Sequence, residues 1–275
     1  MPLSSRFYEV EDPEAVQELF HSRGWTDGLP IVPPTPELIQ GCLDVAKLQA
    51  DHLIGIEPVR KRFISAEKLA INTIMAGCLP IYFPAVVASI TAMLQEPFLL
   101  HGAIASTSGC AVLMIFNGPI RKELGMSGTF NVLGGSGNRA TTVIGRAVRL
   151  TLYNLLDFRP GMVDRTTIGH PGKISFCLAE DEENTPWDSL AVERGMPKDA
   201  SAITVMAAMA PRQIMNEWTT APEEILDTFI AEMKANMRNY SIYPGNYVII
   251  MPPQIRDHFE NAGWSKQDIQ HYVFE

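Results

Sequence analysis

The chain has 275 residues, of which 46% are hydrophobic and 19% charged, a composition that excludes a disordered protein and predicts a large buried core. Acidic residues outnumber basic ones by 31 to 22, and the formal charge of −9 disfavours nucleic acid as a partner. Because we find no apolar signal segment and no apolar stretch long enough to cross a bilayer, we expect a cytoplasmic protein with no membrane partner.

Helices and strands are predicted to alternate along the chain, which favours an α/β fold. Hydrophobic periodicity predicts helices over 13–24, 36–48, 66–77, 84–95, 138–156, 186–193 and 222–236, and two short helices near the end. Short apolar runs predict strands over 102–106, 111–116, 173–178, 202–208 and 246–251. We therefore expect a mixed sheet flanked by helices, in one domain over 1–275 or in two closely packed lobes, 1–134 and 135–275.

Two segments share the pattern F-x-x-x-G-W, namely Phe20–Trp25 and Phe259–Trp264. The pattern is typical of a helix end at which glycine takes the left-handed conformation and tryptophan packs back on phenylalanine. Shortly after the second pattern, Ser265 and Asp268 have the spacing of a cap for the last helix.

Glycine is concentrated ahead of the long predicted helix, in the segment LGGSGNRATTVIGRAVRL over 133–150. Gly135–Ala140 matches the G-x-G-x-x-A pattern of dinucleotide-binding turns, but helical periodicity continues up to Asp157, where such a fold requires a strand. No Lys-Ser or Lys-Thr pair follows the glycines, which excludes a Walker loop. We therefore expect no nucleotide cofactor.

Glycines before a helix leave its first backbone N–H groups open, and these groups together with the helix dipole form an anion site. We expect this turn and the helix after it to bind a small anionic substrate. The predicted binding residues are Gly135, Ser136, Gly137, Asn138, Arg139 and Arg146, with Asp27 of the turn GWTDGLP reaching the same cleft. The alternative is that the arginines pair with acidic side chains, which we favour for Arg149.

The four cysteines lie far apart and form no C-x-x-C pair, so we expect neither a zinc site nor a disulfide framework. Cys78 follows a predicted helix end, and Cys110 closes the connection STSGC between two predicted strands, so both are expected near loops. Either thiol is a candidate nucleophile if a base or helix N-terminus lowers its pKa, although a free cysteine is more often a small buried hydrophobe. Cys42 is expected in the core. The pattern around Cys177 does not distinguish a reactive thiol from a buried one.

Glu180 follows the predicted strand 173–178, and carboxyl ends of strands are where open α/β sheets place their sites. It is therefore a candidate acid or base, with His170 as its candidate partner. Glu182 and Glu183 are explained as acidic residues at a helix start. No H-E-x-x-H or G-x-S-x-G motif occurs, so we expect no metal and no serine hydrolase.

Several long segments together resemble the UGSC family of bacterial proteins, some of which carry a selenocysteine in a Sec-Gly-Ser-Cys motif. These segments are GWTDGLPIVPPT (24–35), INTIMAGCLPIYFP (71–84), NGPIRKELG (117–125), GSGNRATTVIGRAVRL (135–150), GHPGKISFCLAEDEENTPWDSLAVERG (169–195) and AGWSKQD (262–268). The resemblance spans nearly the whole chain and implies a thiol- or selenol-linked enzyme acting on small molecules. The chain departs from the family in lacking the Sec/Cys-Gly-Ser-Cys motif, and in having Ile81 in place of a glutamate and Gln254-Ile255 in place of a Glu-His pair.

The leading hypothesis is a thiol-assisted hydrolase or lyase in which Cys110 or Cys78 attacks a small anionic substrate and His170 or Glu180 moves protons. Thiol redox chemistry is less favoured because the sequence has no adjacent pair of thiols. The departures from the family leave open a non-catalytic or half-site subunit of a hetero-oligomer, and also a binding protein without chemistry. We expect a homo-oligomer or a hetero-oligomer with a related subunit.

Overall fold

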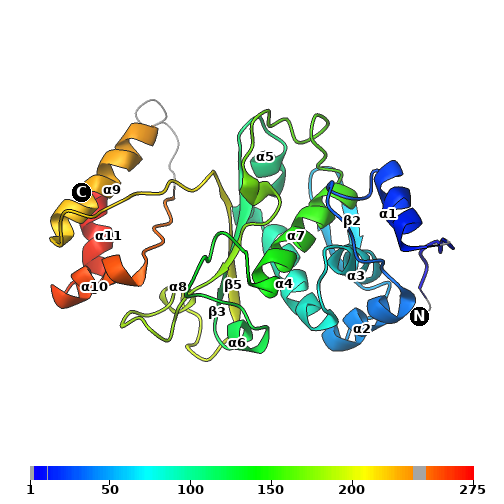
Figure 1. Cartoon of the computed structure of the whole chain (residues 1–275), viewed down its shortest axis with the longest axis horizontal. Coiled ribbons are helices and arrows are strands. Elements are labelled where there is room, and N and C mark those ends of the chain that lie inside the picture. The colour runs from blue at the N-terminus through cyan, green and yellow to red at the C-terminus, as the bar shows by residue number, and fades with distance from the viewer. Residues whose placement is uncertain (1–2, 11, 238–245) are drawn as a thin grey trace. The chain divides into compact units, whose positions relative to one another are not determined.

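The computed structural model describes residues 3–10, 12–237 and 246–275, whose helices and strands have the mixed α/β character that the sequence predicts (Figure 1). The chain divides into two units, each taken by itself below. Unit 1 comprises Met1–Asp181 and Leu190–Ala210, and unit 2 comprises Glu182–Ser189 and Pro211–Glu275. The lobe boundary expected after residue 134 falls inside unit 1.

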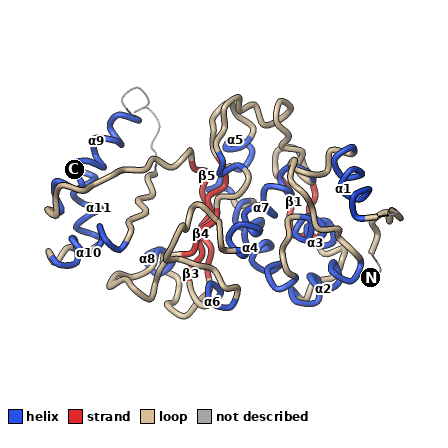
Figure 2. The backbone as a smooth tube through the Cα atoms, viewed as in Figure 1, coloured by secondary structure: helices blue, strands red, loops and turns tan. Residues whose placement is uncertain are grey.

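A three-stranded mixed sheet lies in unit 1, with the strand order β4-β3-β5 (Figure 2). The central strand β3 (Ala111–Asn117) pairs in parallel with β4 (Cys177–Ala179) and antiparallel with β5 (Ala202–Ala208). All seven residues of β3 are buried, as expected for a central strand covered on both faces.

Alternation along β3 gives unit 1 two layers of core. Val112, Met114 and Phe116 belong to the large core, which is formed with helices that include α4 (Phe83–Met93) and α7 (Arg139–Asn154). Figure 1 shows these two helices beside the sheet. Leu113 and Ile115 belong to a smaller core on the other face. Residues of opposite parity therefore pack on opposite faces, as the strand period of two requires.

The other elements of unit 1 surround this centre. The helices are α1 (Pro13–Ser22), α2 (Pro36–Ala46), α3 (Ala66–Met75), α5 (Leu100–Ile104), α6 (Ile120–Glu123) and α8 (Leu190–Glu193), with 3-10 turns at Pro80–Tyr82, Glu96–Phe98 and Pro171–Lys173. A hairpin of β1 (Leu53–Glu57) and β2 (Arg62–Ser65) precedes α3.

Unit 2 is built from α9 (Pro222–Met237), α10 (Pro253–Asn261) and α11 (Lys266–Phe274). Ile225, Leu226, Phe259 and Ile269 form its buried core. The segment 182–189 also belongs to this unit, because the Trp187 indole packs on its core and donates to the Trp264 carbonyl at 3.3 Å. The predicted cap of α11 is confirmed: Ser265 and Asp268 form a reciprocal capping box.

Both F-x-x-x-G-W segments end helices as predicted. Gly24 and Gly263 have φ angles of +63° and +75°, a conformation that glycine adopts without steric cost. Each following tryptophan donates its N–H to the carbonyl of the phenylalanine, at 3.0 Å in α1 and 2.9 Å in α10. The ring pairs are edge-to-face, with centroids 5.5 and 6.0 Å apart. Local sequence chemistry alone therefore specifies these two ends.

Three strand predictions need correction. The segment predicted as strand 102–106 belongs mostly to helix α5, because a short apolar run does not distinguish a buried strand from a buried helix. Residues 246–251 form no strand, and β4 begins only at Cys177. The hairpin β1–β2 was not predicted. Its solvent-facing side carries the apolar residues Ile56 and Phe63, so the strands lack the alternation of apolar and polar residues that indicates a strand.

No single helix among the described residues has the length and apolar character needed to cross a membrane. Pro80–Met93 and Glu96–Ile104, which meet at a bend of 75°, reach that length and hydropathy only when taken together.

Candidate functional site

Polar groups of the glycine-rich turn before α7 form hydrogen bonds with one another and with the first turn of the helix. Asn138 caps the helix by accepting from the Thr141 N–H at 3.0 Å, and its own N–H donates to the Gly135 carbonyl at 3.1 Å. The Thr142 hydroxyl donates to the same carbonyl at 2.7 Å, where a Cβ on Gly135 would clash with it. Ser136 and Gly137 are exposed. The glycines therefore allow a tight turn over the helix start.

The predicted binding side chains around this turn are used within the protein. Arg139 donates from two guanidinium nitrogens to the Gly77 carbonyl, at 2.7 and 3.2 Å, just past the end of α3. A cation at that position complements the negative end of the α3 dipole. In the structure the Arg139 fork is thus directed at a helix C-terminus.

Arg146 and Asp27 bind each other. Two guanidinium nitrogens donate to the two carboxylate oxygens at 2.8 Å each, and the side chains are only 11% and 9% exposed. Burial raises the pKa of Asp27, but the hydrogen bonds and charge of Arg146 outweigh burial and lower it below the ordinary 3.8. The pair is a buried, bidentate ion pair that fastens the turn after α1 to α7, which corrects their assignment to a substrate.

The four cysteines are free, and they differ in exposure: Cys42, Cys78 and Cys177 are buried, whereas Cys110 is half-buried. Burial raises the pKa of Cys42 to about 12 and also raises the pKa of Cys78 and Cys177. The Cys78 thiol donates to the Val143 carbonyl at 3.3 Å. Cys78 therefore lies in the core, and Cys110 is the candidate nucleophile that is not buried.

Glu180 and His170 lie at opposite ends of the sheet. The Glu180 N–H donates to the carbonyl of Phe116, near the end of β3, and its carboxylate accepts from Asn117 at 2.7 Å and from the Leu190 N–H at 2.9 Å. His170 packs edge-to-face on Phe176 and interacts with the backbone of Ala208, which pairs with Ala111 at the start of β3. The length of β3 thus separates the two residues, and they do not form the acid–base pair that the sequence suggested.

Both nitrogens of His170 are turned into the protein. Nδ1 accepts from the Gly172 N–H at 3.2 Å, which caps the turn Pro171–Lys173, and Nε2 is buried. Burial lowers the pKa of His170 below 6.5, while the Ala208 backbone opposes that shift. His170 therefore caps this turn in the structure, and burial favours its neutral form.

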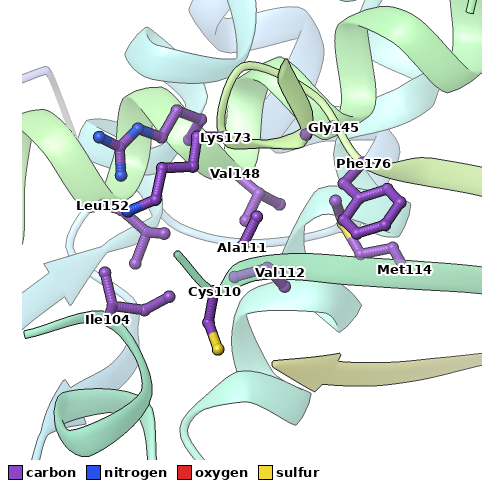
Figure 3. A pocket seen from close by; sticks show the side chains of 12 residues that line it. Ile104, Cys110, Ala111, Val112, Met114, Gly145, Val148, Leu152, Lys173 and Phe176 are labelled. Carbon is purple, nitrogen blue, oxygen red and sulfur yellow. The ribbon is translucent and has the colours of Figure 1, made fainter. Parts of the chain in front are cut away.

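Cys110 lies on the wall of a small, partly open cavity with a volume of about 10 Å³, the room that one water needs. Most of its lining is apolar, and two cationic side chains, Arg149 and Lys173, share the wall with the thiol. Figure 3 shows Cys110 and Lys173 on different sides of this space, with the sulfur directed away from Lys173. The other lining residues are Ile104, Ala111, Val112, Met114, Gly145, Val148, Leu152, Gly172 and Phe176. A larger ligand would therefore lie along the mouth of this cavity.

The two cations share one carboxylate, that of Asp164. Lys173 Nζ lies 2.8 and 3.0 Å from its two oxygens, and Arg149 lies 3.3 Å from one of them. Burial raises the pKa of Asp164, but the hydrogen bonds from Lys173 and Thr166 outweigh burial and lower it overall. The group of three side chains therefore keeps one net positive charge, held at low exposure: 13% for Arg149, 14% for Lys173 and 3% for Asp164.

Sequence reasoning missed this triad. The expected pairing of Arg149 with an acid is confirmed, but its partner Asp164 lies in a loop and the second cation Lys173 in a short 3-10 turn, where no periodicity indicates which side chains meet. Thr166 joins this loop to the thiol segment by donating to the Ser108 carbonyl.

A larger hollow, of about 380 Å³, lies near the end of α2 and is lined by residues that include Gln40, Asp44 and Lys47. Its lining contains no cysteine or histidine. Among the residues that the structure describes, no group of three or more His, Cys, Asp or Glu side chains is arranged to hold a metal ion.

Comparisons with models of protein families, with curated proteins and with solved structures found no match to this chain.

Proposed function

We propose that unit 1 carries out thiol-dependent chemistry on a small anionic substrate, with Cys110 as nucleophile. One observation carries the proposal: the half-buried thiol shares a cavity wall with two cations that a single carboxylate only partly neutralises. The resemblance to the UGSC family, which implies thiol or selenol chemistry, points in the same direction.

The placement of thiol and cations suggests how such a substrate binds. Its anionic end is held by Lys173 and Arg149, and its reacting carbon extends along the apolar wall toward Cys110. In this proposal the Cys110 side chain rotates so that its sulfur faces the bound substrate. In the hydrolase form of the proposal, the Cys110 sulfur bonds to an acyl carbon, the bond to the leaving group breaks, and the thiol proton passes to the leaving group. Water then cleaves the thioester, which releases the acid and restores the thiol. A lyase form uses the same anion site.

The test compares alkylation of Cys110 by iodoacetate, an anion, with alkylation by the neutral iodoacetamide. We expect iodoacetate to be favoured relative to its reaction with free cysteine, because Lys173 and Arg149 concentrate the anion at the thiol. Lys173→Gln should lower the iodoacetate rate by about tenfold, corresponding to one charge-assisted contact, and change the iodoacetamide rate little. The rates are measured by mass spectrometry of the Cys110 peptide.

Arg194→Gln is the matched control, because it removes an exposed positive charge from unit 1 that is not part of the cavity. An equal loss in this variant, or the same reagent preference as free cysteine, would contradict the anion site.

Cys110→Ser should abolish turnover of small anionic esters and thioesters without a large change in melting temperature. Full turnover in that variant would remove the nucleophile from the proposal.

A second candidate is a half-site subunit of a hetero-oligomer. It is favoured because the cavity lining contains no histidine, aspartate or glutamate to accept a proton from the thiol. The outer edge of β5 offers a place for a partner strand: Ile203, Val205 and Ala207 direct their backbone groups away from β3, and no described residue bonds to them. Turnover by the isolated chain would exclude this candidate.

A further inference from the structure

Basic side chains gather where the turn of the β1–β2 hairpin meets the segment after α7. Arg60, Arg62 and Arg159, here called the arginine cluster, surround the carboxylate of Asp157. None of them lines the cavity at Cys110. The segments 57–63 and 157–159 together carry four basic and two acidic residues, a local net charge of +2 in a chain of −9. After both carboxylates are counted, two positive charges in these segments remain without a counter-charge.

The single carboxylate is shared by all three guanidinium groups. Arg60 and Arg62 approach one oxygen of Asp157 at 3.3 and 3.7 Å, and Arg159 approaches the other at 3.1 Å. Since both oxygens are engaged and only one negative charge is present, the three like charges are not fully compensated at Asp157.

Two of the three arginines are fixed by further contacts. Arg60 donates to the Leu156 carbonyl at 2.6 Å, at the C-terminus of α7. Arg159 donates to the Gly24 carbonyl at 2.8 Å, and its guanidinium lies 4.5 Å from the centre of the Tyr153 ring. A helix C-terminus contributes only about half a negative charge, so these contacts position the cations without neutralising them.

Arg62 differs from the other two in its exposure. Half of its side chain, 50%, is exposed, compared with 22% for Arg60 and 27% for Arg159. Its ion pair with Asp157, at 3.7 Å, is the longest of the three. The Arg62 guanidinium can therefore reorient toward a ligand and lose only its long ion pair with Asp157. The other two guanidinium groups stay in place.

The backbone beneath the cluster is fixed by Glu57, whose side chain is fully buried. Its two oxygens accept the N–H groups of Val59 and Arg60, at 3.1 and 2.6 Å, and so hold the hairpin turn. Because this turn is already ordered, a ligand that binds Arg60 and Arg62 does not lose affinity to the free-energy cost of ordering a loop.

We propose that the arginine cluster binds a phosphate group, with Arg62 closing onto it. A dianionic phosphate matches the two excess positive charges better than a carboxylate does, and planar guanidinium forks bind phosphate oxygens in pairs. This site is independent of the proposed chemistry at Cys110.

The test is a calorimetric titration of the full chain at low ionic strength and pH 8, with inorganic phosphate and phenyl phosphate as probes. We expect saturable binding that Arg62→Gln weakens by about tenfold, the equivalent of one charge-assisted contact, and that Arg62→Lys restores only in part because lysine lacks the fork. Equal affinity for the two probes supports recognition of the phosphate group alone. Tighter binding of phenyl phosphate supports a phosphate ester as the natural source.

Arg194→Gln again provides the control for removal of one exposed positive charge. An equal loss of affinity in this variant would overturn the proposal, as would the absence of saturable binding to the unmodified chain. Asp157→Asn gives an independent measurement, because asparagine tolerates the φ of +58° at this position and the change releases three guanidinium groups. It should tighten phosphate binding, and weaker binding at an unchanged melting temperature would contradict the site.

Discussion

Arg146 and Asp27 are a case in which two residues suited to binding a substrate are used to hold the fold. Their ion pair is bidentate and nearly closed to solvent, so each charge depends on the other. Breaking a buried pair from one side is costly because it leaves a buried charge without its counter-charge.

Asp27→Asn should therefore lower the free energy of unfolding by about 3 kcal/mol, measured by urea denaturation. The native pKa of Asp27 lies below the ordinary 3.8, so the stability that this carboxylate contributes is complete above about pH 3.8 and is lost as the pH falls through the lowered value. That part of the acid dependence should be missing from the variant. Asp44→Asn, at an exposed carboxylate, is the control, and an equal loss there would refute the role of the pair.

At the scale of elements, His170 shows how a titratable group can serve as a cap. It accepts the Gly172 N–H through Nδ1, which requires that nitrogen to be unprotonated. Because the native pKa is lowered, the unfolded chain binds the proton more readily. The stability contributed by neutral His170 is therefore present above about pH 6.5 and decreases as the pH falls below it.

His170→Asn should remove this dependence, because asparagine keeps an acceptor at the N-cap and does not titrate. The measurement is the melting temperature of both proteins between pH 7.5 and pH 5, where the unmodified chain should lose more stability than the variant. Parallel curves would show that the imidazole titrates equally in the folded and unfolded chain.

The elements that the sequence predicts are those with local signals. A proline at the start and a glycine after the end predict α1 and α10, and the Ser265 cap predicts the start of α11. Short apolar runs predict β3 and β5. Whether an arginine meets an acid, a helix end or a ligand depends on contacts between segments far apart in the chain. The sequence thus identified Arg139, Arg146 and Cys110 as residues of interest, but it could not assign the first two to internal partners or join the third to Lys173.

At the scale of the whole molecule, the cores of unit 1 and unit 2 share no residue. Phe259 is fully buried in unit 2, and Phe259→Ala should cost that unit about 3–5 kcal/mol. We expect rapid tryptic cleavage after Arg256 and Lys266, while three of the four cysteines, all of which lie in unit 1, stay unreactive toward a thiol reagent. The control is Phe274→Ala, at a phenylalanine of unit 2 that is 92% exposed. General exposure of thiols would show that the two units unfold together.

The indole of Trp187 finds its acceptor 77 residues further along the chain, at Trp264. During translation at about 5–20 residues per second, the segment 182–189 therefore waits roughly 4–15 s before its partner helices are made. In that interval β5 is synthesised and can complete the central sheet, while the apolar side chain of Trp187 still lacks the helices that cover it. A nascent chain arrested before residue 253 would carry this exposed indole, and we expect a chaperone to bind the chain at that stage.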